Sequence, residues 1–185
     1  MKINISLSEA FYNKTVTGDA SKAFDYSFVA CEISVTNFIR HVLSGKAWAV
    51  GVYKNNHRKR EIVSADGKTS TDNFISSGVL ALDLDDKGVS VPDCQQNAAI
   101  ARYAALVHPT ATSSKDHSKT RIVFVLDKPL ADVEKWELAQ RACIRHFAEL
   151  EPDVRCRDAA RYFYGCDRGE AHERPDAVLP LTVVA

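Results

Sequence analysis

Two aspartates separated by one residue close an apolar segment near the middle of the chain. The segment reads Val-Leu-Ala-Leu-Asp-Leu-Asp-Asp over residues 79–86, and apolar residues on both faces are typical of a strand buried on both sides. Because side chains alternate along a strand, Asp83 and Asp85 are predicted to project from the same face. The two carboxylates repel, nothing local neutralises them, and Mg²⁺ or Mn²⁺ would remove the conflict. The alternative is a polar turn that ends a strand.

A second polar segment, residues 112–121, joins two apolar runs and gathers hydroxyl groups, an imidazole and cations. Within it, His117, Lys119 and Arg121 carry chemistry suited to a triphosphate. Arg121 opens the run Arg-Ile-Val-Phe-Val-Leu, which is predicted to hold its guanidinium on a strand. A solvated hairpin loop is the alternative interpretation.

A third segment, residues 151–165, leads acids and arginines into an aromatic run that ends in Gly165. Asp153 could complete a three-carboxylate metal site, and Arg161 could contact a phosphate or a base. The alternative is a connector with surface ion pairs, which contribute little to stability.

A short basic run lies upstream of the carboxylate pair. Its members Arg58, Lys59 and Arg60 are predicted to contact nucleic-acid phosphates, whereas a solvated loop is the usual alternative. The chain has 24 Lys+Arg and 24 Asp+Glu, which argues against a uniformly basic coat. However, residues 40–61 carry six Lys/Arg against one acid, and residues 83–86 carry three acids and no base. The composition therefore excludes indiscriminate nucleic-acid binding but not a local site.

The composition also indicates a folded protein. Of the 185 residues, 45% are hydrophobic, which excludes intrinsic disorder, and no stretch approaches the ~18 apolar residues of a membrane span. The N-terminus lacks the apolar core of a secretory signal, and the five cysteines include no Cys-x-x-Cys pair; a cytoplasmic location is expected. No repeat or linker divides the sequence, so residues 1–185 are predicted to form one domain.

Strands and helices are interleaved along the chain, which predicts an α+β fold with a mixed sheet covered by helices. β-Branched and aromatic runs bounded by turn formers predict strands at Ile3–Leu7, Ala47–Tyr53, Gly78–Asp85, Leu106–Thr112, Thr120–Leu126, Ala160–Tyr164 and near Val178–Val183. Helical spacing of apolar residues predicts helices at Val35–Ser44, Asp93–Ala105 and Asp132–Leu150, the last with Asp132 as its N-cap.

In order and spacing, the three polar segments together resemble the catalytic core of the archaeo-eukaryotic primase superfamily. The resemblance is strongest to its primase-polymerase (prim-pol) branch, found in plasmid, phage and CRISPR-associated replication proteins, and it spans roughly residues 47–165. It implies an RRM-like sheet palm, flanked by helices and packed against a small α/β N-terminal module. The chain could then be a domain excised from a longer replication protein.

The resemblance also implies roles for single residues. Asp83 and Asp85 match the first motif, the metal-binding pair. Ser114 and His117 lie where the second motif, Ser-x-His, contacts the nucleotide, although the spacing here is Ser-x-x-His.

The third motif of the family contains a further metal-binding aspartate. Asp153, eight residues before Arg161, matches it best, and Asp158 is the competing candidate.

The activity implied is that of a template-dependent nucleotidyltransferase, which is a DNA primase, a DNA polymerase or both. Two divalent metals, Mg²⁺ or Mn²⁺, would assist the joining of dNTPs or NTPs to a 3′-hydroxyl with release of pyrophosphate. The expected partners are a single-stranded DNA template, a primer, and a fused or associated helicase or accessory domain.

Two other functional classes remain open. A rolling-circle replication endonuclease uses a similar RRM-like sheet but needs two histidines two residues apart, a pair that the sequence lacks. A non-catalytic single-strand-binding module would leave the three separated acids without a role. Zinc is not expected, because Cys156, Cys166 and His172 lack the close spacing of a structural zinc site.

Overall fold

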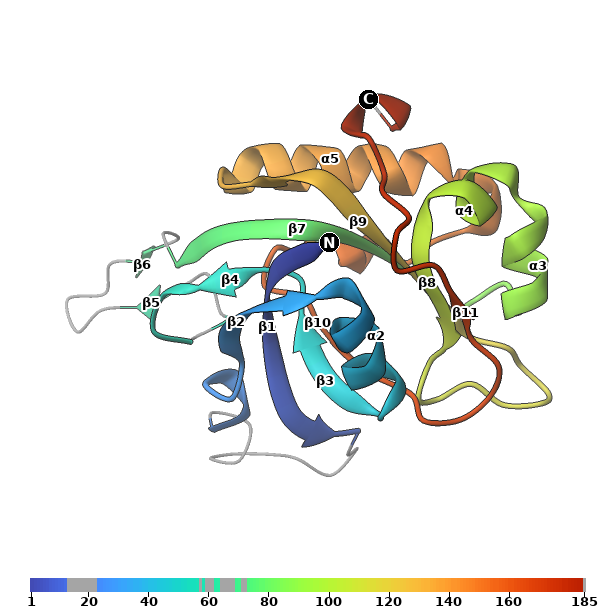
Figure 1. Cartoon of the computed structure of the whole chain (residues 1–185), viewed down its shortest axis with the longest axis horizontal. Helices are drawn as coiled ribbons and strands as arrows, with labels where there is room; N and C mark the ends of the chain where they lie inside the picture. Colours follow the sequence, from blue (N-terminus) through green and yellow to red (C-terminus); the bar gives the residue numbers. More distant parts are fainter. Residues whose placement is uncertain (13–22, 57, 59–61, 64–68, 71–72, 185) are drawn as a thin grey trace.

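The chain folds into two larger antiparallel sheets that share an apolar core. The computed structural model describes residues 1–12, 23–56, 58, 62–63, 69–70 and 73–184. A four-stranded sheet has the order β10-β3-β1-β2, a five-stranded sheet has the order β11-β8-β9-β7-β4, and β5 pairs with β6 (Figure 1). The strands are β1 (Lys2–Phe11), β2 (Val29–Ser34), β3 (Lys46–Ala49), β4 (Val52–Tyr53), β5 (Ile62–Val63), β6 (Thr69–Ser70), β7 (Phe74–Leu84), β8 (Ala104–Pro109), β9 (Thr120–Leu130), β10 (Tyr162–Tyr164) and β11 (His172–Glu173).

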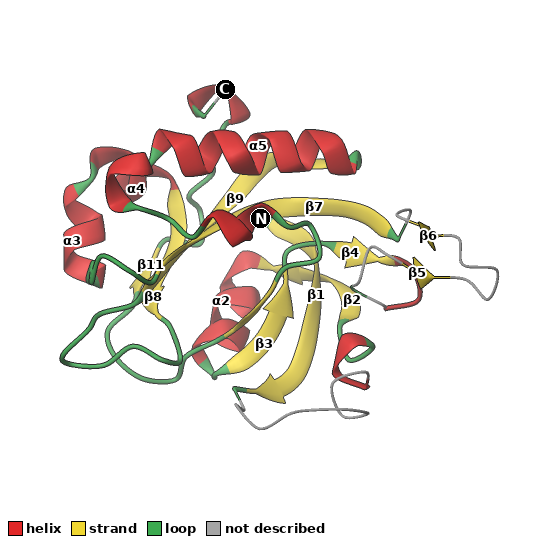
Figure 2. Cartoon of the chain, turned by 180° about the vertical axis from the view of Figure 1, so that it is seen from behind, coloured by secondary structure: helices red, strands yellow, loops and turns green. Residues whose placement is uncertain are grey.

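The helices pack against these sheets (Figure 2). The long helix α5 lies along β7 and β9 of the five-stranded sheet, and α2 lies against the four-stranded sheet (Figures 1 and 2). The α-helices are α2 (Val35–Leu43), α3 (Val91–Gln96), α4 (Ala98–Tyr103) and α5 (Val133–His146); the 3₁₀ turns are η1 (Lys54–Asn56), η2 (Ala148–Leu150), η3 (Val154–Arg157) and η4 (Leu181–Val183). Among the described helices none is long and apolar enough to cross a membrane.

The predicted α+β class is confirmed, but the predicted mixed sheet is wrong. Every pairing between the named strands of the described chain is antiparallel. The one parallel contact recorded is an isolated bridge from Leu126 to Leu179. This bridge and the turn η4 stand where a strand was expected near Val178–Val183. The strands β2 and β11 carry no strong alternation and were not expected from the sequence.

The predicted strand Ala47–Tyr53 is in fact two strands in different sheets. β3 ends at Ala49 and β4 begins at Val52, so the chain changes sheets at Val50 and Gly51. At this crossing the Gly51 N–H donates to the Tyr53 hydroxyl (3.1 Å), which donates in turn to the Ala159 carbonyl (2.8 Å). Nothing in a continuous apolar run predicts such a crossing, because the pattern reports burial and not the partner strand.

The long C-terminal helix is confirmed together with its N-cap. The Asp132 carboxylate accepts a hydrogen bond from the Lys135 N–H (3.0 Å) at the start of α5. The predicted helix Asp93–Ala105 is divided into α3 and α4, because the Asn97 side chain accepts from two backbone N–H groups and so starts a new helix.

α5 also completes the hydrogen bonding of β7. One edge of β7 pairs with β9. Within the described chain, the other edge pairs with a strand, β4, at Phe74 and Ser76. The Trp136 indole donates to the Val79 carbonyl (3.0 Å). The Gln140 side chain bonds both the N–H (3.2 Å) and the carbonyl (2.8 Å) of Ala81. Since unpaired buried backbone groups are costly, these side chains fix α5 against the strand that carries the carboxylate pair.

A close backbone contact at Gly165 joins β10 to the end of α2. The Gly165 N–H donates to the Lys46 carbonyl (3.0 Å), and a Cβ at Gly165 would lie 2.8 Å from that carbonyl oxygen and closer still to that of Val42. We therefore expect Gly165→Ala to lower the free energy of unfolding by more than about 2 kcal/mol, as measured by urea denaturation. The matched control is Gly78→Ala, where the nearest atom is 4.0 Å away; equal losses in the two variants would contradict the prediction.

Candidate functional site

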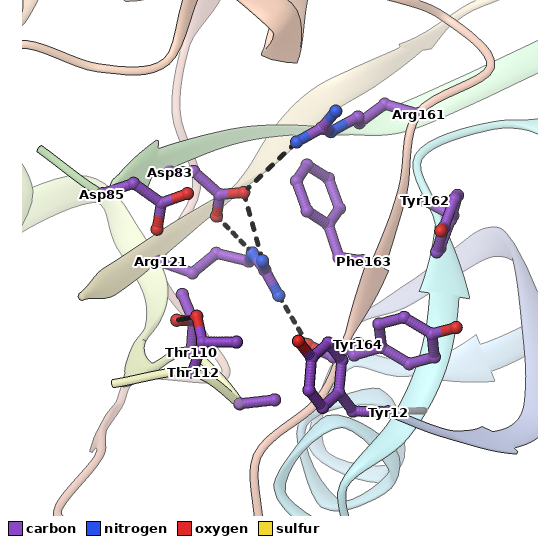
Figure 3. A pocket seen from close by; sticks show the side chains of 11 residues that line it. Tyr12, Asp83, Asp85, Thr110, Thr112, Arg121, Arg161, Tyr162, Phe163 and Tyr164 are labelled. Atoms are coloured by element: carbon purple, nitrogen blue, oxygen red, sulfur yellow. Dashed lines mark hydrogen bonds and ion pairs between the residues drawn. The ribbon is translucent and has the colours of Figure 1, made fainter. Parts of the chain in front are cut away.

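The carboxylate pair lies at the end of β7 and opens into a cavity of about 250 Å³. Asp83 and Asp85 both line this cavity, as expected from the alternation of side chains along a strand. The cavity has a charged wall and an aromatic wall (Figure 3). Its remaining lining residues are Tyr12, Thr110, Ala111, Thr112, Arg121, Arg161, Tyr162, Phe163 and Tyr164.

Asp83 forms a buried, bidentate ion pair with Arg121. The pairing of β7 with β9 places the two residues directly opposite each other. Arg121 donates from Nε to one carboxylate oxygen (2.6 Å) and from a terminal nitrogen to the other (3.1 Å), and the two side chains are only 7% and 4% exposed. The expectation that nothing local neutralises the pair is therefore wrong for Asp83.

The rest of the Arg121 guanidinium is also occupied. It donates to the Tyr164 carbonyl (2.5 Å), and its central carbon lies 4.2 Å from the centre of the Phe163 ring (Figure 3). On the neighbouring strand β8, His108 lies opposite Arg121; burial, together with the charge of Arg121, lowers the pKa of His108 to about 3. His108 is therefore neutral, and Arg121 leaves little surface for the triphosphate that it was predicted to contact.

Asp85 is the least compensated carboxylate of the cavity. Its nearest cation is the Lys119 ammonium, 3.9 Å from a carboxylate oxygen. Burial, and then the neighbouring Asp83 charge, raise the pKa of Asp85 above its ordinary range, while Lys119 and Arg121 oppose the shift. A bound cation would relieve this penalty.

Asp153 lies beside Asp83, although 70 residues separate them in the sequence. The Asp153 N–H donates to the Asp83 carbonyl (2.8 Å), which continues the hydrogen bonding along the free edge of β7. Arg161 connects the two acids, with one terminal nitrogen 3.5 Å from an Asp153 oxygen and 3.8 Å from an Asp83 oxygen. The competing candidate Asp158 is exposed and caps a local turn by accepting from the Ala160 N–H (2.8 Å).

Ser114 and His117 form a local turn at the rim of the site. The Ser114 hydroxyl accepts from the His117 N–H (3.1 Å), and the His117 ring bonds the Asp85 carbonyl through Nε2 (2.6 Å). Both residues are exposed, and neither is among the residues that line the cavity. His117 thus contacts the backbone of the carboxylate pair, while Ser114 holds the turn.

The basic run is only partly described, and its described member points inward. Arg58 forms an ion pair with the buried Asp25 (2.5 Å), donates to the Ala160 carbonyl (3.0 Å) and lies over the Tyr162 ring at 4.4 Å. Its side chain is 14% exposed, so Arg58 is a packing residue in this structure. Lys59 and Arg60 lie outside the described residues.

Sequence reasoning missed the residues of the aromatic wall. Tyr12 lies edge-on to Tyr164, with ring centres 5.3 Å apart, and Tyr162 lies edge-on to Tyr164 at 5.5 Å (Figure 3). The Arg-Tyr-Phe-Tyr run was predicted to form an aromatic strand, with a site role for its arginine alone. Its alternation is the signal that could have placed two tyrosines on one face. Tyr12 carried no such signal, since only tertiary structure brings it to the cavity.

The carboxylates fit a divalent cation in part. A carboxylate offers about four lone-pair positions, and Arg121 takes two of those on Asp83. The Asp85 side chain has no recorded hydrogen bond within the described residues. Asp83 and Asp85 can therefore serve as oxygen ligands, whereas the Asp153 oxygens are already bonded by Arg155. In the described part of the chain, no group of three or more His, Cys, Asp or Glu side chains is arranged to hold a metal ion.

Comparison of the chain with family models, curated proteins and solved structures returned no match.

Proposed function

We propose that the chain is a template-dependent nucleotidyltransferase that joins dNTPs or NTPs to a 3′-hydroxyl and releases pyrophosphate. The observation that carries the proposal is one cavity lined by Asp83 and Asp85, by the guanidinium of Arg161 3.8 Å from Asp83, and by an aromatic wall. Such chemistry suits a nucleotide, because carboxylates hold cations, a guanidinium binds phosphate and aromatic rings stack on bases.

Asp83 and Asp85 would hold Mg²⁺ or Mn²⁺, with Asp153 as the third candidate ligand. Such an ion supplies positive charge for the triphosphate and lowers the pKa of an attacking 3′-hydroxyl. Arg121 keeps the Asp83 carboxylate in one orientation through its two hydrogen bonds. Arg161, which lines the cavity, would bind phosphate oxygens.

The residues at the rim have positioning roles in this proposal. Lys119 lies 3.9 Å from Asp85, where its charge can also attract the β- and γ-phosphates. His117 supports the Asp85 backbone, and the Ser114 turn supports His117. Positioning and charge stabilisation, and not covalent chemistry by the protein, would supply the rate enhancement.

The proposal extends to the prim-pol branch of the archaeo-eukaryotic primases. The five-stranded sheet with α5 would be the RRM-like palm, and the four-stranded sheet with α2 would belong to the N-terminal module. A single-stranded template and a primer would be the nucleic-acid partners, with Lys59 and Arg60 as candidate phosphate contacts. A helicase or accessory domain and a cytoplasmic location complete the proposal.

A primer-extension assay tests this function. With a primed single-stranded template, labelled dNTPs and Mn²⁺, we expect the wild-type chain to lengthen the primer. We expect Asp83→Ala combined with Asp85→Ala to reduce extension at least about 10²-fold. The matched control combines Asp116→Ala with Asp127→Ala, which removes two exposed carboxylates.

The products separate the proposed function from its rivals. Extension by the Asp83/Asp85 variant at the wild-type rate would end the proposal. Cleavage of the template would indicate an endonuclease, and binding of the template without any product would indicate a non-catalytic module.

A further inference from the structure

Both oxygens of the Asp153 carboxylate accept hydrogen bonds from Arg155, two positions later in the chain. Arg155 donates from Nε to both Asp153 oxygens (3.0 and 2.9 Å), and its backbone N–H donates to one of them (2.9 Å). Although burial alone would raise the pKa of Asp153, these bonds and the charges of Arg155 and Arg161 hold it below its ordinary range. Asp153 is thus a charged carboxylate that an internal guanidinium already satisfies.

The same compensation extends across the site. Each of the three acids has at least one cationic group within 4.0 Å, and the ion pairs are Asp83–Arg121, Asp83–Arg161, Asp153–Arg155, Asp153–Arg161 and Asp85–Lys119. Each acid therefore already has a cationic neighbour from the chain itself, at the shortest distance for Asp83 and Asp153 and at the longest for Asp85. A divalent cation that uses all three must compete with those side chains.

We propose that Arg155 is an internal competitor of the divalent cation at Asp153. This inference rests on the proposed function, and it adds a residue to which the sequence assigned no role. While Arg155 holds both oxygens, the cation site consists of Asp83 and Asp85 alone. A bound triphosphate attracts the guanidinium groups of Arg161 and Arg155, and Asp153 then becomes free to join as the third ligand. Binding of the polyanion and of the cation is thereby coupled.

The burial of each arginine determines how easily it can leave its carboxylate partner. The Arg121 side chain is 7% exposed, so breaking its pair with Asp83 would leave a desolvated charge. The Arg155 side chain is 73% exposed, so its head group regains water when it leaves Asp153. Arg161 is intermediate at 27%, its two ion pairs are 3.5 and 3.8 Å long, and its buried Nε has no recorded partner in the described part of the chain.

The competition predicts the sign of a change in Mn²⁺ affinity, which can be measured without nucleotide. Removing the Arg155 guanidinium should free Asp153, so that Mn²⁺ binds more tightly than it does to the wild-type chain. When one binding event changes the affinity of another, the change is commonly about 5- to 150-fold. A residue with a purely structural role would weaken the site when removed, which is the opposite result.

Titration of the whole chain with Mn²⁺, followed by electron paramagnetic resonance of the free ion, tests the inference. We expect Arg155→Ala and Arg155→Gln to tighten Mn²⁺ binding at least about fivefold. The matched control is Arg157→Ala, which removes the same charge from the same 3₁₀ turn, η3; its affinity should stay within twofold of wild type. Adding Asp153→Asn to Arg155→Ala should abolish the gain.

The outcomes separate this inference from the proposed function. Equal Mn²⁺ affinity of the wild type and the Arg155 variants overturns the inference, as does an equal gain in Arg157→Ala. If Mn²⁺ binding is abolished by Asp85→Asn in either case, the cation site of the proposed function still stands. Absence of Mn²⁺ binding in every variant overturns both.

Discussion

Arg121→Ala is expected to lower the free energy of unfolding by about 3–5 kcal/mol, the usual cost of breaking a buried ion pair from one side. The variant leaves the Asp83 carboxylate, whose side chain is 4% exposed, without its two hydrogen bonds. It also leaves the Tyr164 carbonyl without its donor and removes the contact with the Phe163 ring. Urea denaturation in the presence of a chelator measures the loss without interference from bound cations.

The matched control for this variant is Arg141→Ala. Arg141 pairs with Glu137 one helical turn away on α5, and its side chain is 56% exposed. Such a pair contributes at most about 1 kcal/mol, so the control reports the cost of losing an arginine without losing a buried contact. A loss in Arg121→Ala no larger than in the control would contradict the burial of the pair.

A double-mutant cycle with Asp83→Asn identifies the partner of Arg121. If the two groups stabilise the fold through each other, the double variant should lose less than the sum of the single variants, with a coupling of about 0.5–3 kcal/mol. Strict additivity would mean that Arg121 stabilises the fold through another group, such as the Tyr164 carbonyl.

The features of this fold that could be predicted from the sequence are those with local causes. The apolar spacing of α5 and the N-cap at Asp132 both depend on neighbours within one turn of helix, and both were found as expected. The buried strand β7 follows from an apolar run on both faces. The same local signal placed Asp83 and Asp85 at one cavity.

The features that could not be predicted depend on strand register and on the partition of strands between sheets. No property of Asp83 or Arg121 alone shows that β7 and β9 place them opposite each other. The sequence therefore suggested two roles, cation ligand and phosphate contact, for groups that bind each other. Likewise, contacts between distant segments determine where the chain changes sheets at Gly51 and why Tyr12 lines the cavity.

Asp153 was predicted as a site residue from the sequence, but its hydrogen-bond partners were not. The resemblance to the primase motif suggested it ahead of Asp158, and the hydrogen bond from its N–H to the Asp83 carbonyl gives a physical reason for its position. The bond from Arg155 could not be anticipated, because an acid and an arginine two residues apart face each other only in a particular turn. Here the turn η3 provides that geometry.

The second large effect is expected for Asp85→Asn, which should raise the stability of the metal-free chain and lower its activity. In the folded chain, burial and then the Asp83 charge raise the pKa of Asp85, so the folded state binds the proton more tightly than the unfolded state does. The contribution of Asp85 to stability is therefore largest below the unfolded pKa of about 3.9 and is lost as the pH rises through the folded pKa. Near neutral pH the full penalty is present, and Asn removes it.

We accordingly expect Asp85→Asn to be more stable than the wild type in chelator near neutral pH, by about 0.5–1 kcal/mol for a partly exposed charge. The difference should disappear below the unfolded pKa. Primer extension by the variant should fall about 10²–10³-fold, the usual loss when one group that stabilises a transition state is removed. Thermal unfolding across a pH series and the extension assay measure the two effects on the same preparations.

Addition of Mn²⁺ should reverse the order of stability. An ion held at a concentration of 100 times its dissociation constant stabilises the state that binds it by about 2.7 kcal/mol, and only the wild type retains the Asp85 ligand. A variant that is less stable than the wild type in chelator, and also less active with Mn²⁺, would indicate that Asp85 serves the fold. If Asp85 serves cation binding, Asp85→Asn should be more stable than the wild type without metal and less active. The reason is that the buried Asp85 charge destabilises the metal-free fold.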